Sequence, residues 1–222
     1  MCGRYVLKAN VNELSEAYLA EPEEGLFFEP IYNVAPTTEM PVIFRKGSER
    51  IIDRFRWGLI PFWAKDQNPK YSMINARQET ITEKKSYSKP FISQRCIVPA
   101  NGFYEWRKEE NGKQPYYITF TDKTFMSFAG IYERWQGEGG KKINSFTIIT
   151  TDANKTVSNL HDRMPAILHE EEFSFWLDPA NNDTKALKEI LLPYEDNGIE
   201  YYPVSKKVNS PRNQEKELIE PV

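Results

Sequence analysis

The sequence is short of cysteine and histidine, and this shortage excludes several classes of protein. Its 222 residues include two cysteines, Cys2 and Cys96, and two histidines, His161 and His169. Two cysteines cannot form the disulfide framework of a small secreted domain. These four residues also lack the spacing of a zinc site, so we expect no metal and no cofactor.

Long apolar runs and a strong excess of one charge are also missing. No stretch approaches the roughly 20 apolar residues that a membrane-spanning helix needs, and the N-terminus lacks the regions of a signal peptide. The formal net charge is -3, which argues against coating nucleic acid through bulk electrostatics. We therefore expect a cytoplasmic, intracellular protein with no membrane contact. Nothing in the sequence demands more than a monomer.

Aromatic and β-branched residues dominate the middle of the chain, and helical patterns flank it. The length fits one large domain, and we expect this domain to span residues 1–222, with Met1 removed and an extended tail at 210–222. Asn10 and Glu13 resemble a capping pair and predict a helix near 11–20. Strands are predicted at 41–45, 51–57, 96–106, 115–121, 125–132 and 144–151. We predict an α+β fold with a largely antiparallel, barrel-like β core flanked by helices.

The opening residues, MCGRY, place one of the two cysteines at position 2. Aminopeptidases that trim Met1 accept small second residues, cysteine among them. Cys2 would then carry a free α-amine and a thiol on neighbouring carbons. The sequence alone leaves open what chemistry would use such a 1,2-aminothiol.

Two polar segments have patterns that favour a site, although each also has a simpler interpretation. In INAR, an extended chain points Asn75 and Arg77 to the same side, but a surface strand with a solvated arginine explains it equally. In HDRMP, Pro165 favours an extended chain that aims His161 and Arg163 one way. An imidazole can transfer protons near neutral pH, so a catalytic role for His161 is consistent but not required.

The segment RCIVPANGFYEW holds a carboxylate among aromatic residues. Glu105 lies in a predicted strand beside Tyr104 and Trp106, where desolvation raises a carboxyl pKa toward the range of a general acid or base. The alternative is a structural ion pair with Arg107. We expect Cys96, at the start of the segment, to be a buried thiol without a chemical role.

Aromatic residues also gather in RWGLIPFWAKD at 56–66. Large aromatic residues of this kind usually belong to the core. In a nucleic-acid site, Trp57 or Trp63 would instead stack on bases.

Taken in order, these motifs resemble one known family. MCGR, NVAP, WGLIPFW, INARQE, RCIVPANGFYEW, HDRMP and VSKKVN occur along nearly the whole chain as they do in the SOS-response-associated peptidase (SRAP) family. Members are known as abasic-site processing proteins, which bind single-stranded DNA and capture an abasic site through the N-terminal cysteine. The resemblance implies a thiazolidine crosslink between Cys2 and the opened sugar, and a role in DNA repair.

The resemblance also assigns roles to individual residues. It implies that Asn75 orients the Cys2 terminus or the sugar, that Glu105 moves protons, and that His161 assists ring opening and imine chemistry. It implies DNA contacts for a further six residues: Arg4, Arg77 and Arg163 on phosphates, Thr150 on sugar or phosphate, and Trp63 and Pro36 near the gap left by the missing base.

Two other functions stay open at this point. Cys2, Glu105 and His161 suit a cysteine peptidase with an N-terminal nucleophile, as the family name suggests. A non-catalytic adaptor for nucleic acid or protein, with Cys2 as a core residue, is the third hypothesis.

Overall fold

A closed barrel of five strands forms the centre of the computed structural model, which describes residues 2–67, 73–110 and 112–222. The order around the barrel is β11 (Lys142–Asp152), β10 (Met126–Gln136), β7 (Arg95–Ala100), β4 (Glu39–Lys46) and β5 (Glu49–Trp57). Neighbours are antiparallel, except that β11 closes the ring through a parallel pairing with β5. Three short strands extend the sheet: β12 (Arg163–Pro165), β6 (Asn75–Arg77) and β2 (Glu21–Pro22).

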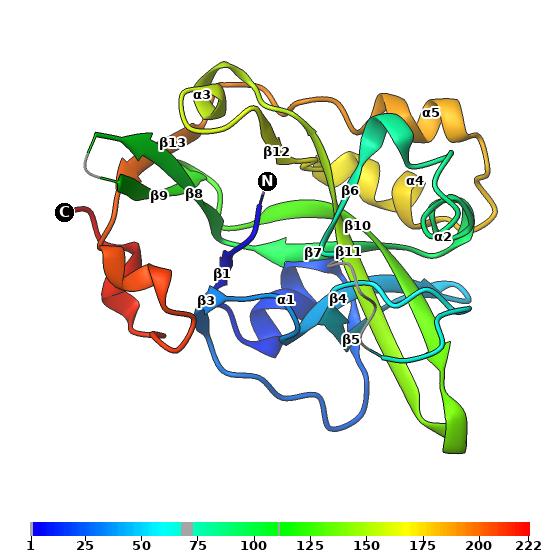
Figure 1. Ribbon diagram of the computed structural model, residues 1–222. Coiled ribbons are helices and arrows are strands. Elements are labelled where there is room, and N and C mark those ends of the chain that lie inside the picture. Colours follow the sequence, from blue (N-terminus) through cyan, green and yellow to red (C-terminus); the bar gives the residue numbers. More distant parts are fainter. Residues whose placement is uncertain (1, 68–72, 111) are drawn as a thin grey trace.

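A second sheet of five strands lies beside the barrel (Figure 1). Its order is β13 (Ile199–Pro203), β9 (Gly112–Phe120), β8 (Gly102–Glu109), β1 (Tyr5–Leu7) and β3 (Ile31–Val34), and each strand pairs antiparallel with its neighbours. Strand β7 leads into β8 after Ala100, so the predicted strand at 96–106 is two strands that belong to different sheets. The predicted α+β fold with a largely antiparallel, barrel-like core is confirmed.

Short helices surround the two sheets, as predicted. The α-helices are α1 (Val11–Tyr18), α2 (Ser88–Ser93), α3 (Lys155–Ser158), α4 (Phe173–Leu177) and α5 (Thr184–Glu189). Single turns of 3-10 helix occur at η1 (Gln78–Thr80), η2 (Glu138–Gly140), η3 (Glu170–Glu172), η4 (Lys206–Asn209) and η5 (Lys216–Ile219). No helix in the described part of the chain is long and apolar enough to cross a membrane.

Aromatic side chains fill the barrel. Phe55 packs against Phe44 and Tyr132 with ring centroids 5.4 and 5.3 Å away, and Trp57 is fully buried against Tyr5, 5.1 Å away. Such pairs add to the free energy gained by removing the rings from water. The core therefore accounts for Trp57, as the usual behaviour of large aromatic residues predicts.

The C-terminal segment differs from its prediction. Residues 210–222 do not form an extended tail, because Leu218 is buried with Val204 and Val208 in a second apolar cluster. Pro221 also bridges to Val204. The predicted removal of Met1 concerns a residue outside those described.

The first helix begins with the capping box that the sequence predicts. The Asn10 side chain accepts a hydrogen bond from the Glu13 amide at 3.1 Å, and the Glu13 carboxylate accepts one from the Asn10 amide at 2.7 Å. Two helix amides are thereby satisfied that would otherwise lack an intrahelical partner. Leu14 and Tyr18 form the buried face of this helix.

Replacing the cap is expected to destabilise the protein. Asn10→Ala removes one of the two reciprocal bonds, so we expect a loss of about 1 kcal/mol in the free energy of unfolding, measured by urea denaturation. Asn12→Ala is the matched control, since Asn12 is exposed on the same helix. Equal effects of the two substitutions would contradict the role of the cap.

Candidate active site around Cys2

Cys2 lies just before β1, and its side chain is fully buried. Its thiol is 3.8 Å from the carbonyl oxygen of Arg4. Burial, followed by the charge of Glu105, raises the pKa of the thiol far above its ordinary value. Cys2 is therefore a neutral thiol near neutral pH, and a carboxyl group lies close to it.

The side chain of Asn75 holds the backbone of Cys2. Its Nδ2 donates a hydrogen bond to the carbonyl oxygen of Cys2 at 2.8 Å. Strand β6 places it there by pairing in parallel with β11, so that Asn75 lies opposite Ile148. The Tyr87 hydroxyl donates to the Asn75 carbonyl at 3.3 Å and fixes the strand from its other side. The Asn75 side-chain oxygen is buried and has no hydrogen-bond partner among the described residues, so it can accept one from a ligand.

Glu105 and His161 line one pocket of about 480 Å³, together with Trp106, Lys113 and Asn209. Glu105 is 3% exposed, in the middle of β8. Burial raises the pKa of its carboxyl group, and nearby positive charge, including that of His161, offsets part of the rise. A carboxyl group whose pKa is raised is better suited to act as a general acid than an ordinary glutamate.

Gly102 allows β8 to approach its neighbours closely enough to bury Glu105. A Cβ at this position would overlap the carbonyl oxygen of Ile118 and the ring of Tyr117 on β9. The residue pairs with Val6 on β1 and with Thr119 on β9. Glycine at position 102 therefore allows close packing of the sheet that carries Glu105.

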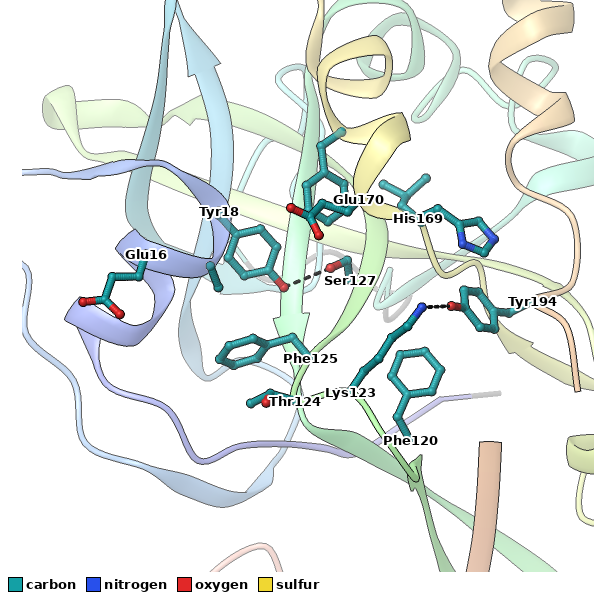
Figure 2. A pocket seen from close by; sticks show the side chains of 13 residues that line it. Glu16, Tyr18, Phe120, Lys123, Thr124, Phe125, Ser127, His169, Glu170 and Tyr194 are labelled. Carbon is teal, nitrogen blue, oxygen red and sulfur yellow. Dashed lines mark hydrogen bonds between the residues drawn. The ribbon is translucent and has the colours of Figure 1, made fainter. Parts of the chain in front are cut away.

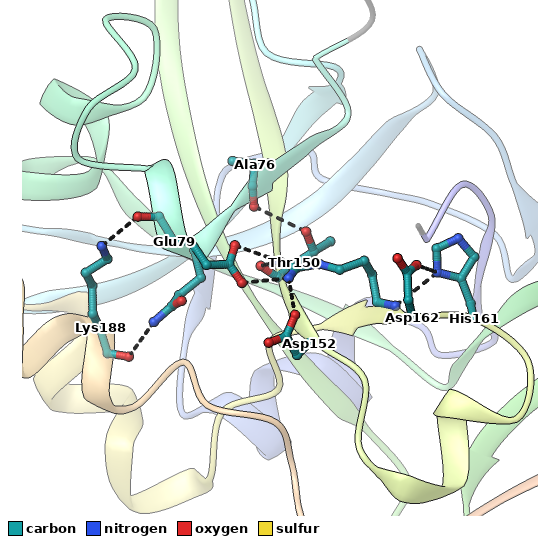
Figure 3. A network of polar contacts seen from close by, with 9 residues as sticks. Ala76, Glu79, Thr150, Asp152, His161, Asp162 and Lys188 are labelled. Carbon is teal, nitrogen blue, oxygen red and sulfur yellow. Dashed lines mark hydrogen bonds and ion pairs between the residues drawn. The ribbon is translucent and has the colours of Figure 1, made fainter.

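A network of ion pairs surrounds the side chain of Arg163, which is 8% exposed (Figure 3). Its guanidinium donates to Glu79 at 2.6 and 3.0 Å, to Asp152 at 2.6 Å and to the carbonyl oxygen of Thr150 at 2.7 Å. Desolvation alone would raise the pKa of Glu79, but the hydrogen bonds and charge of Arg163 outweigh it and lower the pKa. The network ties together η1, β11 and β12, next to His161.

This network bears on two of the DNA contacts expected from the sequence. Arg163 was expected to bind DNA phosphates, but its guanidinium is buried and already bound to two carboxylates within the protein. Thr150 was a second candidate for a DNA contact, and it is also fully buried, with its hydroxyl 3.5 Å from the Ala76 carbonyl oxygen. Both side chains are buried beside the site and contact other parts of the protein.

The other predicted DNA contacts are reached more easily from solvent. Arg77 is exposed at the end of β6, and Trp63 is 49% exposed, with the Lys85 ammonium 5.3 Å from its ring centroid. Arg4 is half-buried and donates to Asn33 at 2.8 Å and to the Val208 carbonyl oxygen at 3.0 Å. Pro36 is half-buried between β3 and β4. Within the described part of the chain, no hydrogen bond links Trp63 or Pro36 to Cys2.

Sequence reasoning missed three features of this site. Asp162 has its carboxylate 2.7 Å from His161 Nδ1, Tyr87 supports Asn75, and Lys113 lines the pocket. The adjacency of histidine and aspartate in HDRMP was an available signal for Asp162. Tyr87 and Lys113 come from distant segments and carry no such signal.

Another pocket, of about 470 Å³, lies elsewhere on the molecule and has different chemistry (Figure 2). Within it the buried Tyr18 hydroxyl lies 3.0 Å from Ser127 Oγ, and Lys123 donates to the Tyr194 hydroxyl at 2.7 Å. These four polar side chains are thus paired with one another, and no cysteine lines the pocket. Across residues 2–67, 73–110 and 112–222, no group of three or more His, Cys, Asp or Glu side chains is placed to hold a metal ion. The pocket beside Cys2 is the better candidate for covalent chemistry.

Comparisons with known proteins point to the family that the motifs indicated. The family model described as "SOS response associated peptidase (SRAP)" matches residues 1–211. The abasic site processing protein YoqW of Bacillus subtilis (strain 168) is 43% identical over 223 residues, covering 99% of each chain. The abasic site processing protein HMCES of Xenopus tropicalis is 38% identical, over 86% of this chain and 66% of its own. A crystal structure of a Bacteroides thetaiotaomicron protein covers both chains completely, with a TM-score of 0.90 and 30% identity.

Substituting each of two arginines is expected to distinguish a buried, structural arginine from an exposed one by the change in the free energy of unfolding. Arg163→Met breaks several charge-assisted hydrogen bonds, so we expect a loss of about 1.5–3 kcal/mol in the free energy of unfolding. Arg77→Met at the exposed end of β6 should change it by no more than about 0.5 kcal/mol.

The difference in the free energy of unfolding between wild type and Arg163→Met is expected to depend on pH in one direction. The lowered pKa of Glu79 means that its stabilisation is present above the pKa of the unfolded chain and is lost as the pH falls through the folded value. The gap between wild type and Arg163→Met should therefore narrow in acid. Urea denaturation from neutral to acidic pH measures this, and a constant or widening gap would contradict the assignment.

Proposed function

The chain belongs to the SOS response associated peptidase family, and from this membership and the site's geometry we propose that it processes abasic sites in single-stranded DNA by covalent capture on Cys2. The names of its relatives, abasic site processing proteins, support an abasic site as the substrate. The observation that carries the proposal is the convergence of Cys2 with Asn75 and Glu105. We place this activity in the DNA damage response inside the cell, carried out by one copy of the chain.

The proposed chemistry begins at the α-amine of Cys2 after Met1 is removed. An opened abasic sugar exposes an aldehyde, and an α-amine with an ordinary pKa of about 7.7–8.0 is partly unprotonated at neutral pH. The amine adds to the aldehyde carbon, and loss of water gives an imine. The thiol then adds to the imine carbon while its proton passes to the nitrogen. The product is a five-membered thiazolidine, and this second step is intramolecular.

The neighbouring residues have distinct roles in these steps. Asn75 holds the Cys2 carbonyl and thereby orients the amine and thiol. Glu105, with its raised pKa, donates a proton to the departing hydroxyl, recovers one from the nitrogen as the imine forms, and then relays the thiol proton to that nitrogen. His161, in the same pocket, assists opening of the sugar ring.

Burial of the thiol favours this function over a cysteine peptidase. A peptidase needs a thiolate, whose formation is favoured by a lowered pKa. At Cys2 both burial and the charge of Glu105 raise the pKa. A thiol that reacts with an imine already formed on the same residue has less need of prior ionisation.

Local contacts have to compensate for the net negative charge in holding DNA. We propose that Arg77 and Arg4 bind phosphates beside the lesion and that Trp63 stacks near the missing base. Arg163 and Thr150 take no direct part in this binding, since both are buried.

The crosslink itself is the decisive test. The purified protein, incubated with a single-stranded oligonucleotide that contains an abasic site, is expected to give an adduct that survives denaturation and is detected by gel and intact mass. Cys2→Ala should give none, because both the sulfur and the ring closure are lost. Cys96→Ala is the matched control, since Cys96 is equally buried but lies in the barrel wall. An equal adduct yield from Cys2→Ala would exclude the proposal.

Glu105 is expected to set the pH dependence of capture. Its raised pKa places the change from acid to carboxylate above the ordinary value of about 4.3. The rate of adduct formation should therefore change with pH in that higher range. Glu105→Gln should remove this pH dependence and slow the reaction about 100-fold or more. Single-turnover rates measured across about pH 4–9, a range that spans the ordinary pKa values of a glutamate and an α-amine, test this. A Glu105→Gln profile that matches wild type would remove the assigned role.

A further inference from the structure

The Nδ1 atom of His161 has two neighbours that make opposite demands on it. The Asp162 carboxylate lies 2.7 Å away and requires a proton on Nδ1. The backbone N–H of Arg163 lies 3.0 Å away and requires a lone pair there. One nitrogen cannot satisfy both at once, so the proton on His161 depends on which neighbour prevails.

The fold holds the backbone of both neighbours in place. The Arg163 backbone is fixed because its side chain is bound by Glu79 and Asp152. The backbone of Asp162 is fixed because its carbonyl oxygen accepts a hydrogen bond from the Ala153 amide at 3.0 Å. Figure 3 shows the Asp162 carboxylate turned toward the His161 ring, beside this network.

We propose that Asp162 is a positioning residue that keeps a proton on Nδ1 of His161, so that Nε2 is the nitrogen that exchanges protons with the substrate. The inference rests on the proposed function and deepens it. The shorter contact is the one to Asp162, and a contact to a carboxylate is the stronger kind. The neutral imidazole then has its lone pair on Nε2 and acts as a base. The imidazolium carries a proton on Nε2 and acts as an acid.

Loss of the carboxylate changes this arrangement. The Arg163 N–H then becomes the remaining described neighbour of Nδ1 and favours a lone pair there. The neutral imidazole would carry its proton on Nε2 and could no longer accept one at that atom. Among the described residues, the other charged groups that line the pocket with His161 are Glu105 and Lys113, and neither is altered by the substitution.

The tautomer can be measured without DNA. Two-bond ¹H–¹⁵N correlation spectra of the neutral imidazole are expected to show the Nδ1–H form in wild type and the Nε2–H form in Asp162→Ala. Asp162→Glu should restore the Nδ1–H form. The Asp162 side chain is 86% exposed, so Asp162→Ala is expected to fold. An Nε2–H form in wild type, or the same tautomer in wild type and Asp162→Ala, would overturn the assignment.

Kinetics give a second readout. Above a pH of about 7.5, where an ordinary imidazole is mostly neutral, Asp162→Ala is expected to form the adduct about two- to fivefold more slowly, the size of an exposed ion pair. Glu195→Gln is the matched control, because Glu195 lies 3.3 Å from Nε2 of His169, outside the pocket. Equal rates for wild type and Asp162→Ala, or an equal slowing in Glu195→Gln, would contradict the inference. If no variant and no wild-type protein formed an adduct, the proposed function would fail, while the tautomer spectra would still decide the role of Asp162.

Discussion

The pairing of β11 with four other strands is the constraint on which the site depends. It joins β10 and β12 on antiparallel edges and β5 and β6 on parallel ones. The pairing with β5 closes the barrel, and the pairing with β6 carries Asn75 to the backbone of Cys2. The pairing with β12 brings Arg163 opposite Asp152 and so positions His161. A single strand thus links three segments that are far apart in the sequence.

Desolvation is the second determinant of the site, because it raises the pKa of both the Cys2 thiol and the Glu105 carboxyl group. The charge of Glu105 raises the pKa of Cys2 further. The site therefore disfavours the thiolate of Cys2 and shifts Glu105 toward its protonated form. This electrostatic environment suits addition of a thiol to an imine more than attack by a free thiolate, and it explains why a site with a cysteine and a histidine need not be a peptidase site.

Charged residues near the site divide into those that support it and those that face solvent. Arg163 is bound by Glu79 and Asp152, so its charge is neutralised within the protein. Arg77, two residues beyond Asn75 on the same strand, is exposed. The alternation of a β-strand places both on one face, but only their tertiary surroundings make one a ligand of the Cys2 backbone and the other a surface cation.

The sequence by itself determined the local features: the capped helix at Asn10, the strand periods, the burial of Cys96 and the motifs that indicate the family. These depend on neighbours within a few residues, which a linear pattern records. The tertiary structure alone decided that β7 and β8 belong to different sheets, that the C-terminal segment packs through Leu218, and that Arg163 is occupied by carboxylates. Such outcomes depend on contacts between distant segments, and no local spacing in the chain encodes their distances.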